Sequence, residues 1–252
     1  VATLAATGRL ELGPLWAGIY QNLPGGETLA RNSLLAKHYA REVLGIDPAI
    51  AHFGDLPGYT PQYPQIARLA EIEGVLISRG GPRSTPLFVW QAPDGTEITA
   101  YFSVRGYAGY SGPVVWTEDY ATLAGSPLGE RLEADAEGKE YPLLIHWGSD
   151  LYAPVPALVD NVRQWNAEQD RKLVFSTLSR YFDAVGEQAN VRRSGELPSA
   201  WPNIESAWPD VWPEDMPCEA ALHTAEFLAV FCRVVDGKSY PAATLREAWK
   251  HL

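Results

Sequence analysis

The sequence predicts an α/β fold with a parallel sheet, and three observations lead to this prediction. Short apolar segments alternate with stretches that have helical periodicity, as in repeated β-α-β units. Hydrophobic residues make up 46% of the chain and charged residues only 20%, which is sufficient for a full-sized core. Two of the apolar segments are followed by a carboxylate, Asp55 and Asp150, where reacting groups of α/β proteins sit.

The first half of the chain has the pattern of a β-α-β unit. Residues 27–44 carry an apolar stripe at helical spacing, and Gly45 stands at the usual C-terminal position of a helix. Residues 49–53 then predict a strand, residues 64–71 a helix and residues 75–78 a second strand. Because a helix joins the two strands, we expect them to be parallel.

A hairpin is expected next, since residues 87–91 and 97–102 flank the turn dipeptide Asp94-Gly95. We expect this hairpin to lie outside the main sheet. The elements predicted beyond it are a loop at 105–112, an acidic insertion at 117–140, strands at 143–146 and 173–175, helices at 156–169 and 178–187, a loop at 192–217, and a helical hairpin formed by 218–235 and 242–252.

Charge and composition exclude several classes of partner. The net charge of −11 argues against nucleic acid and against an anionic membrane surface, because both require a basic patch. No apolar run approaches the ~20 residues of a membrane span, and residues 1–8 lack the features of a signal peptide. Cys218 and Cys232 are expected on one helix, about 21 Å apart, and therefore unpaired. Together these features predict a cytoplasmic protein.

Asp55 and Asp150 both follow predicted strands, so in a parallel sheet they would project from the same edge. Paired carboxylates at such an edge suggest acid/base or nucleophilic chemistry, and glycoside hydrolysis is the leading case. A carboxylate there can also hold a divalent metal. The alternative is that each aspartate only caps the following helix.

The segment around Asp55 is the most specific motif in the chain. Residues 55–66 read Asp-Leu-Pro-Gly-Tyr-Thr-Pro-Gln-Tyr-Pro-Gln-Ile. This resembles the nucleophile segment of the family 38 α-mannosidases, whose pattern is Asp-x-x-Gly-His/Tyr-Ser-x-x-x-Pro-x-Ile. Further similarity to the same family lies in residues 26–39, in the hairpin around Phe88-Val89-Trp90, in Gly148-Ser149-Asp150, and in residues 225–250.

The resemblance implies the fold and the reaction. It implies an incomplete, parallel, seven-stranded (β/α) barrel-like fold of the glycoside hydrolase/deacetylase type over residues 1–216, with its first strand missing. Residues 217–252 would then begin a helical bundle domain. The implied reaction is retaining hydrolysis of α-mannosides with the help of one zinc ion.

Position by position, the resemblance gives Asp55 the roles of catalytic nucleophile and zinc ligand, and Asp150 the role of general acid/base. Arg79 would orient the carboxylate of the site; without the resemblance, a surface arginine at a strand end is the preferred interpretation. Three aromatic residues would contact sugar, or else only pack in loops: Tyr107, Trp201 and Trp208.

The sequence departs from the family at the zinc site. The His-x-Asp-x-x-Trp motif and the His-Asp motif that supply the other ligands are not found, so we expect those ligands outside this chain. We therefore expect poor hydrolysis by the chain alone. His52, His146 and His223 are more typical of core residues than of substitute ligands. Pro57 and Ser149 replace a Phe and an Asp of the family pattern, which suggests a divergent branch.

Three hypotheses remain open from the sequence. The first is the central part of a family 38 catalytic domain within a longer enzyme, with an α-mannoside as its carbohydrate partner. The second is a non-catalytic carbohydrate-binding relative, and the third is a metal-dependent polysaccharide deacetylase. The sequence leaves homo-oligomer formation open.

Overall fold

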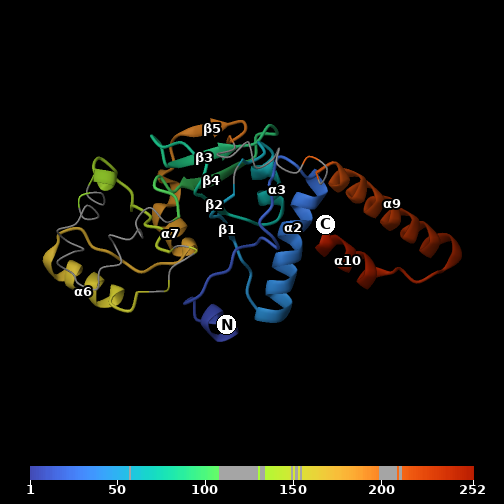
Figure 1. The fold of residues 1–252 in the computed structure, drawn as a ribbon, viewed down its shortest axis with the longest axis horizontal. Helices are drawn as coiled ribbons and strands as arrows, with labels where there is room; N and C mark the ends of the chain where they lie inside the picture. Colours follow the sequence, from blue (N-terminus) through green and yellow to red (C-terminus); the bar gives the residue numbers. More distant parts are fainter. Residues whose placement is uncertain are drawn as a thin grey trace.

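The fold is that of a computed structural model of the 252-residue chain (Figure 1). It describes residues 1–56, 58–107, 130, 134–148, 150, 153, 155–198, 209 and 212–252. The helices are α1 (Ala2–Ala6), α2 (Gly26–Tyr39) with a π-helical turn η1 (Ala40–Leu44), α3 (Tyr63–Leu69), α6 (Leu158–Glu168), α7 (Leu178–Val185) with a 3-10 turn η2 (Gly186–Gln188), α9 (Trp212–Asp236) and α10 (Ala242–His251). The strands are β1 (Ile50–Phe53), β2 (Gly74–Ile77), β3 (Leu87–Gln91), β4 (Glu97–Phe102) and β5 (Arg192–Ser194).

The strands of the described part form a five-stranded mixed sheet in the order β1-β2-β4-β3-β5. β1, β2 and β4 are parallel neighbours, and their last residues are in register, with Phe53 opposite Ile77 and Ile77 opposite Phe102. β3 is antiparallel to β4 and parallel to β5. The three parallel strands β1, β2 and β4 therefore lie side by side, with their carboxyl ends aligned.

Two hydrophobic clusters cover the two faces of the sheet. Val75 and Ile77 of β2 belong to the larger cluster, while Leu76 between them belongs to the smaller one, as expected for alternating side chains in a strand. Aromatic rings dominate the larger cluster, where the Tyr63 ring of α3 stacks on Trp90 of β3 with centroids 6.1 Å apart. The smaller cluster packs α7 against β2, β3 and β4.

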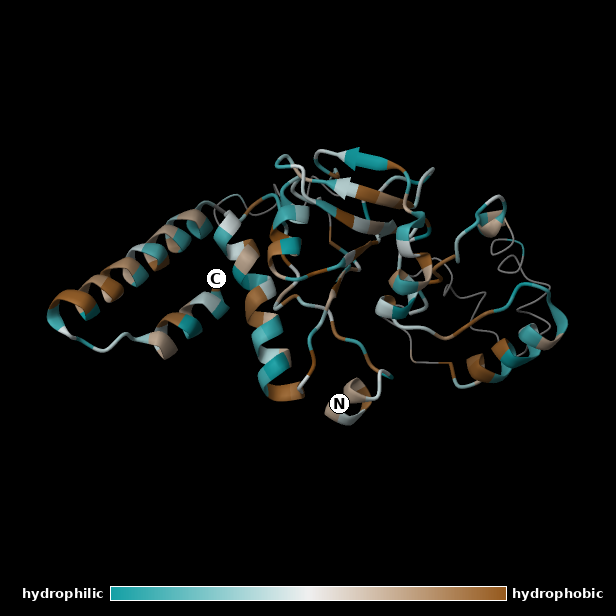
Figure 2. Cartoon of the chain, turned by 180° about the vertical axis from the view of Figure 1, so that it is seen from behind, coloured by the Kyte–Doolittle hydropathy of each residue, from teal (hydrophilic) through white to brown (hydrophobic). Residues whose placement is uncertain are grey.

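The helical hairpin of α9 and α10 is attached to α2 and extends away from the sheet (Figure 1). Arg31 of α2 donates a 2.8 Å hydrogen bond to Glu226 of α9, and its guanidinium lies 4.0 Å from the ring centroid of Trp249 in α10. Apolar side chains such as Phe227 and Phe231 remain exposed on α9. Figure 2 shows that hydrophobic residues recur along α9, which projects from the body of the molecule.

The prediction of an α/β fold is confirmed, but three parts of the predicted sheet are wrong. The hairpin of β3 and β4 is not outside the main sheet, because β4 is the parallel neighbour of β2. Residues 143–146 and 173–175 are not strands: they pair with no described strand, and an apolar run becomes a strand only where a partner supplies backbone hydrogen bonds. Part of the predicted loop at 192–217 forms β5.

Other predictions concern the sheet type and the helices. The described sheet is mixed rather than wholly parallel, and it has fewer strands than the seven of the predicted barrel. The predicted helices match α2 with η1, α3, α6, α7 and α10 to within a few residues. α9 begins at Trp212, six residues before the predicted start and inside the predicted loop, and Cys218 and Cys232 are free thiols on it. Most of the predicted insertion at 117–140 lies outside the described residues. Among the helices in the described ranges, none has the length and apolar character needed to cross a bilayer.

Candidate active site

Asp55, Arg79 and Tyr107 come together because each follows one of the three adjacent parallel strands. Asp55 lies two residues after β1, Arg79 two residues after β2, and Tyr107 a few residues after β4. The guanidinium of Arg79 donates from Nε to Oδ1 of Asp55 at 2.7 Å. It also lies over the ring of Tyr107, with 5.2 Å between the guanidinium carbon and the ring centroid.

A tight turn after β4 places Tyr107 over the end of β2. The amide of Gly106 donates to the carbonyl of Ser103 at 2.8 Å, and the Ser103 hydroxyl donates to the Gly106 carbonyl at 2.8 Å. Gly106 has φ of 72°, a left-handed conformation that favours glycine. This turn reverses the chain, so that the Tyr107 side chain reaches the carboxylate of the neighbouring strand.

Tyr107 also connects the two carboxylates. Its hydroxyl lies 3.2 Å from Oδ2 of Asp55 and 3.0 Å from Oδ2 of Asp150. The pKa of the Tyr107 phenol is raised, first because of partial burial and then because of the hydrogen bond to Asp150 and the charge of Asp55. The phenol therefore keeps its proton at neutral pH and can act as a donor.

Asp55 is accessible to a ligand, although its orientation is fixed. Its side chain is 42% exposed and that of Arg79 is 33% exposed. The loop after Asp55 is held by buried Tyr59, whose hydroxyl donates to the Leu56 carbonyl at 2.6 Å and whose backbone pairs with that of Leu197. The carboxylate is thus held by Arg79 and Tyr107 on a fixed loop while one side remains open to solvent.

Two histidines lie against each other beside this group. The rings of His52 on β1 and His146 have centroids 4.7 Å apart, and the ring of Tyr107 lies 6.3 Å from that of His146. Burial lowers the pKa of both imidazoles. The pKa of His146 falls to about 4, because the neighbouring His52 adds to the effect of burial. Both rings are therefore neutral at pH 7. Their Nε2 (His52) and Nδ1 (His146) have no hydrogen-bond partner among the described residues.

The described residues do not by themselves form a zinc site. Zinc in proteins takes three or four protein ligands, whereas no group of three His, Cys, Asp or Glu side chains in the described ranges is arranged to hold a metal. Both oxygens of Asp55 already contact Arg79 and Tyr107. The role of Asp55 as a zinc ligand therefore stays a prediction.

The structure brings together four of the residues singled out in the sequence: Asp55, Arg79, Tyr107 and Asp150. Trp201 and Trp208 lie outside the described residues, as do Pro57 and Ser149. His223 is on α9, where its ring contacts Trp249 at 5.6 Å between centroids. The catalytic and sugar-contacting roles of all these residues remain predictions.

Sequence reasoning missed the contact between His52 and His146. It treated each histidine as an isolated core residue of an apolar segment. His52 precedes Asp55 by three residues and His146 precedes Asp150 by four, so no shared spacing marked the two histidines as a pair. Only their common position shortly before a carboxylate of the site connected them.

Fold and site define an α/β protein in which one phenol contacts two carboxylates, and paired carboxylates are the groups that most glycoside hydrolases use. The family model for the glycosyl hydrolases family 38 N-terminal domain matches residues 1–203, so the chain belongs to this family.

Individual relatives agree with this membership. Alpha-mannosidase 2C1 of Homo sapiens is 23% identical over 255 residues, which cover 96% of this chain and 24% of the human protein. The crystal structure of an alpha-mannosidase from Enterococcus faecalis V583 superposes with a TM-score of 0.83 at 24% identity, covering 99% of this chain and 30% of that one. A second Enterococcus faecalis structure, of a protein in the glycosyl hydrolase family 38, gives 0.70 at 20% identity, covering 99% and 27%. The likeness to the two solved structures establishes the fold. The chain spans about a quarter of the length of the human relative.

Proposed function

We propose that this chain provides the carboxylate centre of a retaining α-mannosidase, with Asp55 as the nucleophile and Asp150 as the general acid/base. The observation that supports this most directly is the shared contact of Tyr107 with both carboxylates. Family membership supports the hydrolase class. The alpha-mannosidase names of the human and Enterococcus relatives support a mannoside as the substrate.

The distance between the carboxylates supports retention rather than inversion. Oδ2 of Asp55 and Oδ2 of Asp150 can be no farther apart than their two contacts with the phenol placed end to end, at 3.2 and 3.0 Å. Inverting glycosidases hold their carboxyl groups ~6.5–9.5 Å apart to admit a water molecule, and retaining ones ~5–5.5 Å apart. This upper limit on the separation of the two Oδ2 atoms favours the retaining arrangement.

Tyr107 has one phenolic proton for two carboxylate neighbours. A phenol can donate to only one carboxylate at a time, and its hydroxyl lies within hydrogen-bond distance of both Asp55 and Asp150. Retaining hydrolysis uses two carboxyl groups in different roles, one as nucleophile and one as acid/base. The position of Tyr107 between the two aspartates supports this pairing.

The reaction then proceeds in two steps. An oxygen of Asp55 forms a bond to the anomeric carbon while the glycosidic C–O bond breaks and the Asp150 proton passes to the leaving oxygen. Water next attacks the anomeric carbon, its proton passes to Asp150, and the ester bond to Asp55 breaks. Arg79 holds the Asp55 carboxylate in one orientation throughout, through its 2.7 Å hydrogen bond.

The finer architecture and the metal are further parts of this proposal. We propose that residues 1–216 form part of a (β/α) barrel-like domain and that 217–252 begin a helical bundle; the parallel strands β1, β2 and β4 and the α9–α10 hairpin are consistent with both. Zinc is proposed from the family resemblance, with ligands besides Asp55 outside the described residues. No step above depends on it.

The test is Asp55→Asn in the natural protein that contains this sequence. We expect kcat for 4-nitrophenyl α-mannoside to fall at least about 10³-fold, because the neutral amide cannot form the glycosyl ester. Asp160→Asn is the matched control, since Asp160 lies exposed on α6 and pairs only with Arg163 among the described residues. Proton NMR of the first-formed sugar should show the α-anomer. Turnover that survives Asp55→Asn, or a β-anomer product, would refute the assignment.

A further inference from the structure

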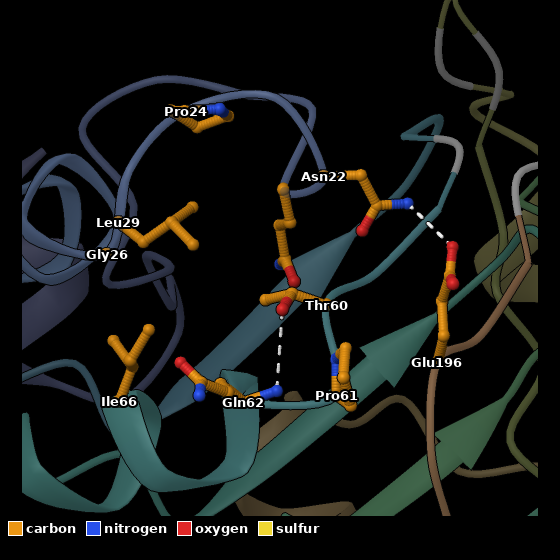
Figure 3. A pocket seen from close by; sticks show the side chains of 10 residues that line it. Asn22, Pro24, Gly26, Leu29, Thr60, Pro61, Gln62, Ile66 and Glu196 are labelled. Carbon is orange, nitrogen blue, oxygen red and sulfur yellow. Dashed lines mark hydrogen bonds between the residues drawn. The ribbon is translucent and has the colours of Figure 1, made fainter. Parts of the chain in front are cut away.

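A polar pocket is lined in part by the segment that follows Asp55 in the chain. It has a volume of about 370 Å³ and is bounded by the segment before α2, by the starts of α2 and α3, and by the residues after β5 (Figure 3). Its lining residues are Gln21, Asn22, Pro24, Gly26, Leu29, Thr60, Pro61, Gln62, Ile66 and Glu196. Small-molecule sites typically enclose about 300–1,000 Å³, so the pocket can hold a ring of hexose size.

Gln21 has a buried side chain in this pocket, and its contribution to the fold does not explain why it is there. Its side chain lines the pocket and is only 3% exposed, yet neither its amide nitrogen nor its amide oxygen has a hydrogen-bond partner among the described residues. A buried amide without partners destabilises the folded state. A ligand that accepts from the nitrogen and donates to the oxygen would satisfy both atoms.

The rest of the lining indicates the chemistry of that ligand. The amides of Asn22 and Gln62 and the Thr60 hydroxyl add further donors and acceptors, and Glu196 adds one carboxylate. No Lys or Arg is among the lining residues in the described ranges, which disfavours phosphate and carboxylate ligands. A neutral ring that carries hydroxyl groups fits this set.

Apolar side chains complete the match. Leu29 of α2 and Ile66 of α3 point into the pocket from its far side (Figure 3). They offer surface for the C–H face of a sugar, while the amides face its hydroxyls. On the opposite side, Asn22 is fixed at the rim by a 3.1 Å hydrogen bond from its Nδ2 to Glu196.

The pocket and the carboxylate site share one loop. Asp55 opens this loop, and Thr60, Pro61 and Gln62 close it as part of the pocket wall. The loop is anchored between them by the pairing of Tyr59 with Leu197, the neighbour of Glu196. The segment that leaves Asp55 therefore becomes part of the pocket wall five residues later, at Thr60.

We propose that this pocket is a second carbohydrate site, which binds a neutral sugar unit of the substrate glycan through the buried amide of Gln21. The sugar unit is thus a part of the substrate remote from the cleaved bond, so this inference rests on the proposed function. The pocket is separate from the carboxylate site, because its lining residues do not include Asp55, Arg79, Tyr107 or Asp150.

Photo-crosslinking tests the pocket without turnover. The probe is methyl α-mannopyranoside bearing a diazirine, and labelled peptides are mapped by mass spectrometry in the natural protein. We expect label in residues 20–29 and 60–66, reduced at least about tenfold in Gln21→Met, which keeps the side-chain length but removes both polar atoms. Gln164→Met, the same change at an exposed position of α6, should leave the label unchanged. Label that persists in Gln21→Met, or that avoids these residues, would overturn the proposal.

Thermal unfolding separates this role from a structural one. Because the Gln21 amide has no hydrogen-bond partner in the described part of the chain, Gln21→Met should leave Tm unchanged or raise it. A clear fall in Tm would show that the amide is needed by the fold and would overturn the proposal.

Two further comparisons identify the source of the sugar and separate the two proposals. Competition by mannotriose at lower concentration than by methyl α-mannoside supports a glycan, whereas equal competition would overturn the link to the substrate. Label at the pocket in Asp55→Asn, which cannot turn over substrate, shows sugar binding whether or not hydrolysis is established. Normal hydrolysis without label at the pocket would refute this inference and leave the proposed function intact.

Discussion

The Tyr107 hydroxyl lies 3.0 Å from the Asp150 carboxylate, although the two residues are 43 positions apart in the sequence. The same hydroxyl contacts Asp55 at 3.2 Å. Tyr107 therefore sets the spacing between the two carboxylates as well as contacting each of them. Its ring is in turn held under the guanidinium of Arg79.

Tyr107→Phe should separate this spacing role from simple packing. The phenylalanine keeps the ring below Arg79 but cannot bridge the carboxylates, and a hydrogen bond to a charged group contributes about 1.5–3 kcal/mol. We expect kcat for 4-nitrophenyl α-mannoside to fall about 10- to 100-fold, with little change in Tm. Tyr39→Phe, at an exposed position of α2, is the control for loss of a tyrosine hydroxyl. Equal activity in Tyr107→Phe and the wild type would mean that the bridge has no catalytic role.

Asp150→Asn should affect substrates according to their leaving group. A general acid matters most when the leaving oxygen is strongly basic, as in a disaccharide, and matters less for 4-nitrophenol. We expect kcat/KM for mannobiose to fall at least about 10²-fold and that for 4-nitrophenyl α-mannoside much less. Rapid mixing should also show a burst of nitrophenol, because the asparagine cannot activate water in the second step.

Asp183→Asn, at an exposed position of α7, is the control for this series. Its kinetic constants for both substrates should match those of the wild type. An equal loss with both substrates in Asp150→Asn would argue that Asp150 contributes to the site in some way other than by proton transfer.

Lys37 provides a test of stability away from the site. Its buried ammonium donates to the carbonyls of Pro48 and Glu71, at 3.0 Å each, and pairs with Asp47 at 3.0 Å. Lys37→Met would leave the buried carbonyl of Pro48 and the part-buried carbonyl of Glu71 without this donor, and we expect the free energy of unfolding to fall by about 2–4 kcal/mol.

Arg41→Met is the matched control for Lys37→Met. Arg41 pairs with Asp47 and Glu71, but on the exposed side of the same helix. Exposed ion pairs contribute little to stability, so urea unfolding of Arg41→Met should resemble that of the wild type. Similar losses of unfolding free energy in the two variants would show that the burial of the Lys37 ammonium is not the source of its stabilising effect.

Much of the site could be predicted from local sequence, because Asp55 and Arg79 follow apolar segments that become adjacent parallel strands. Asp150 was predicted at the end of a strand at 143–146 as well as by the family resemblance, but residues 143–146 form no strand in the structure. The position of β4 in the centre of the sheet could not be predicted. A hairpin signal fixes which strands are antiparallel neighbours, but it carries no information on which further strand its edge will meet.

Gln21 and the histidine pair were beyond sequence reasoning for a different reason. Nothing in the segment around Gln21 distinguishes a buried amide from an exposed one, because its burial arises from α2, α3 and the residues after β5 together. His52 and His146 likewise acquire their lowered pKa values only when tertiary packing removes both rings from water.

Those lowered pKa values predict how stability depends on pH. The pKa of His146 is about 4 in the folded state, against about 6.5 in an unfolded chain. Between these values the unfolded state binds more protons, so stability is complete above about pH 6.5 and is lost as the pH falls toward 4. His52 acts in the same direction. His146→Gln, which cannot be protonated, should reduce the loss of unfolding free energy between pH 7 and 4.5 by on the order of 2 kcal/mol, as measured by urea unfolding.

His38→Gln is the control, because His38 is exposed on α2, and it should retain the wild-type loss of unfolding free energy. If His146→Gln shows the same pH dependence as the wild type, carboxylates rather than this imidazole govern acid unfolding.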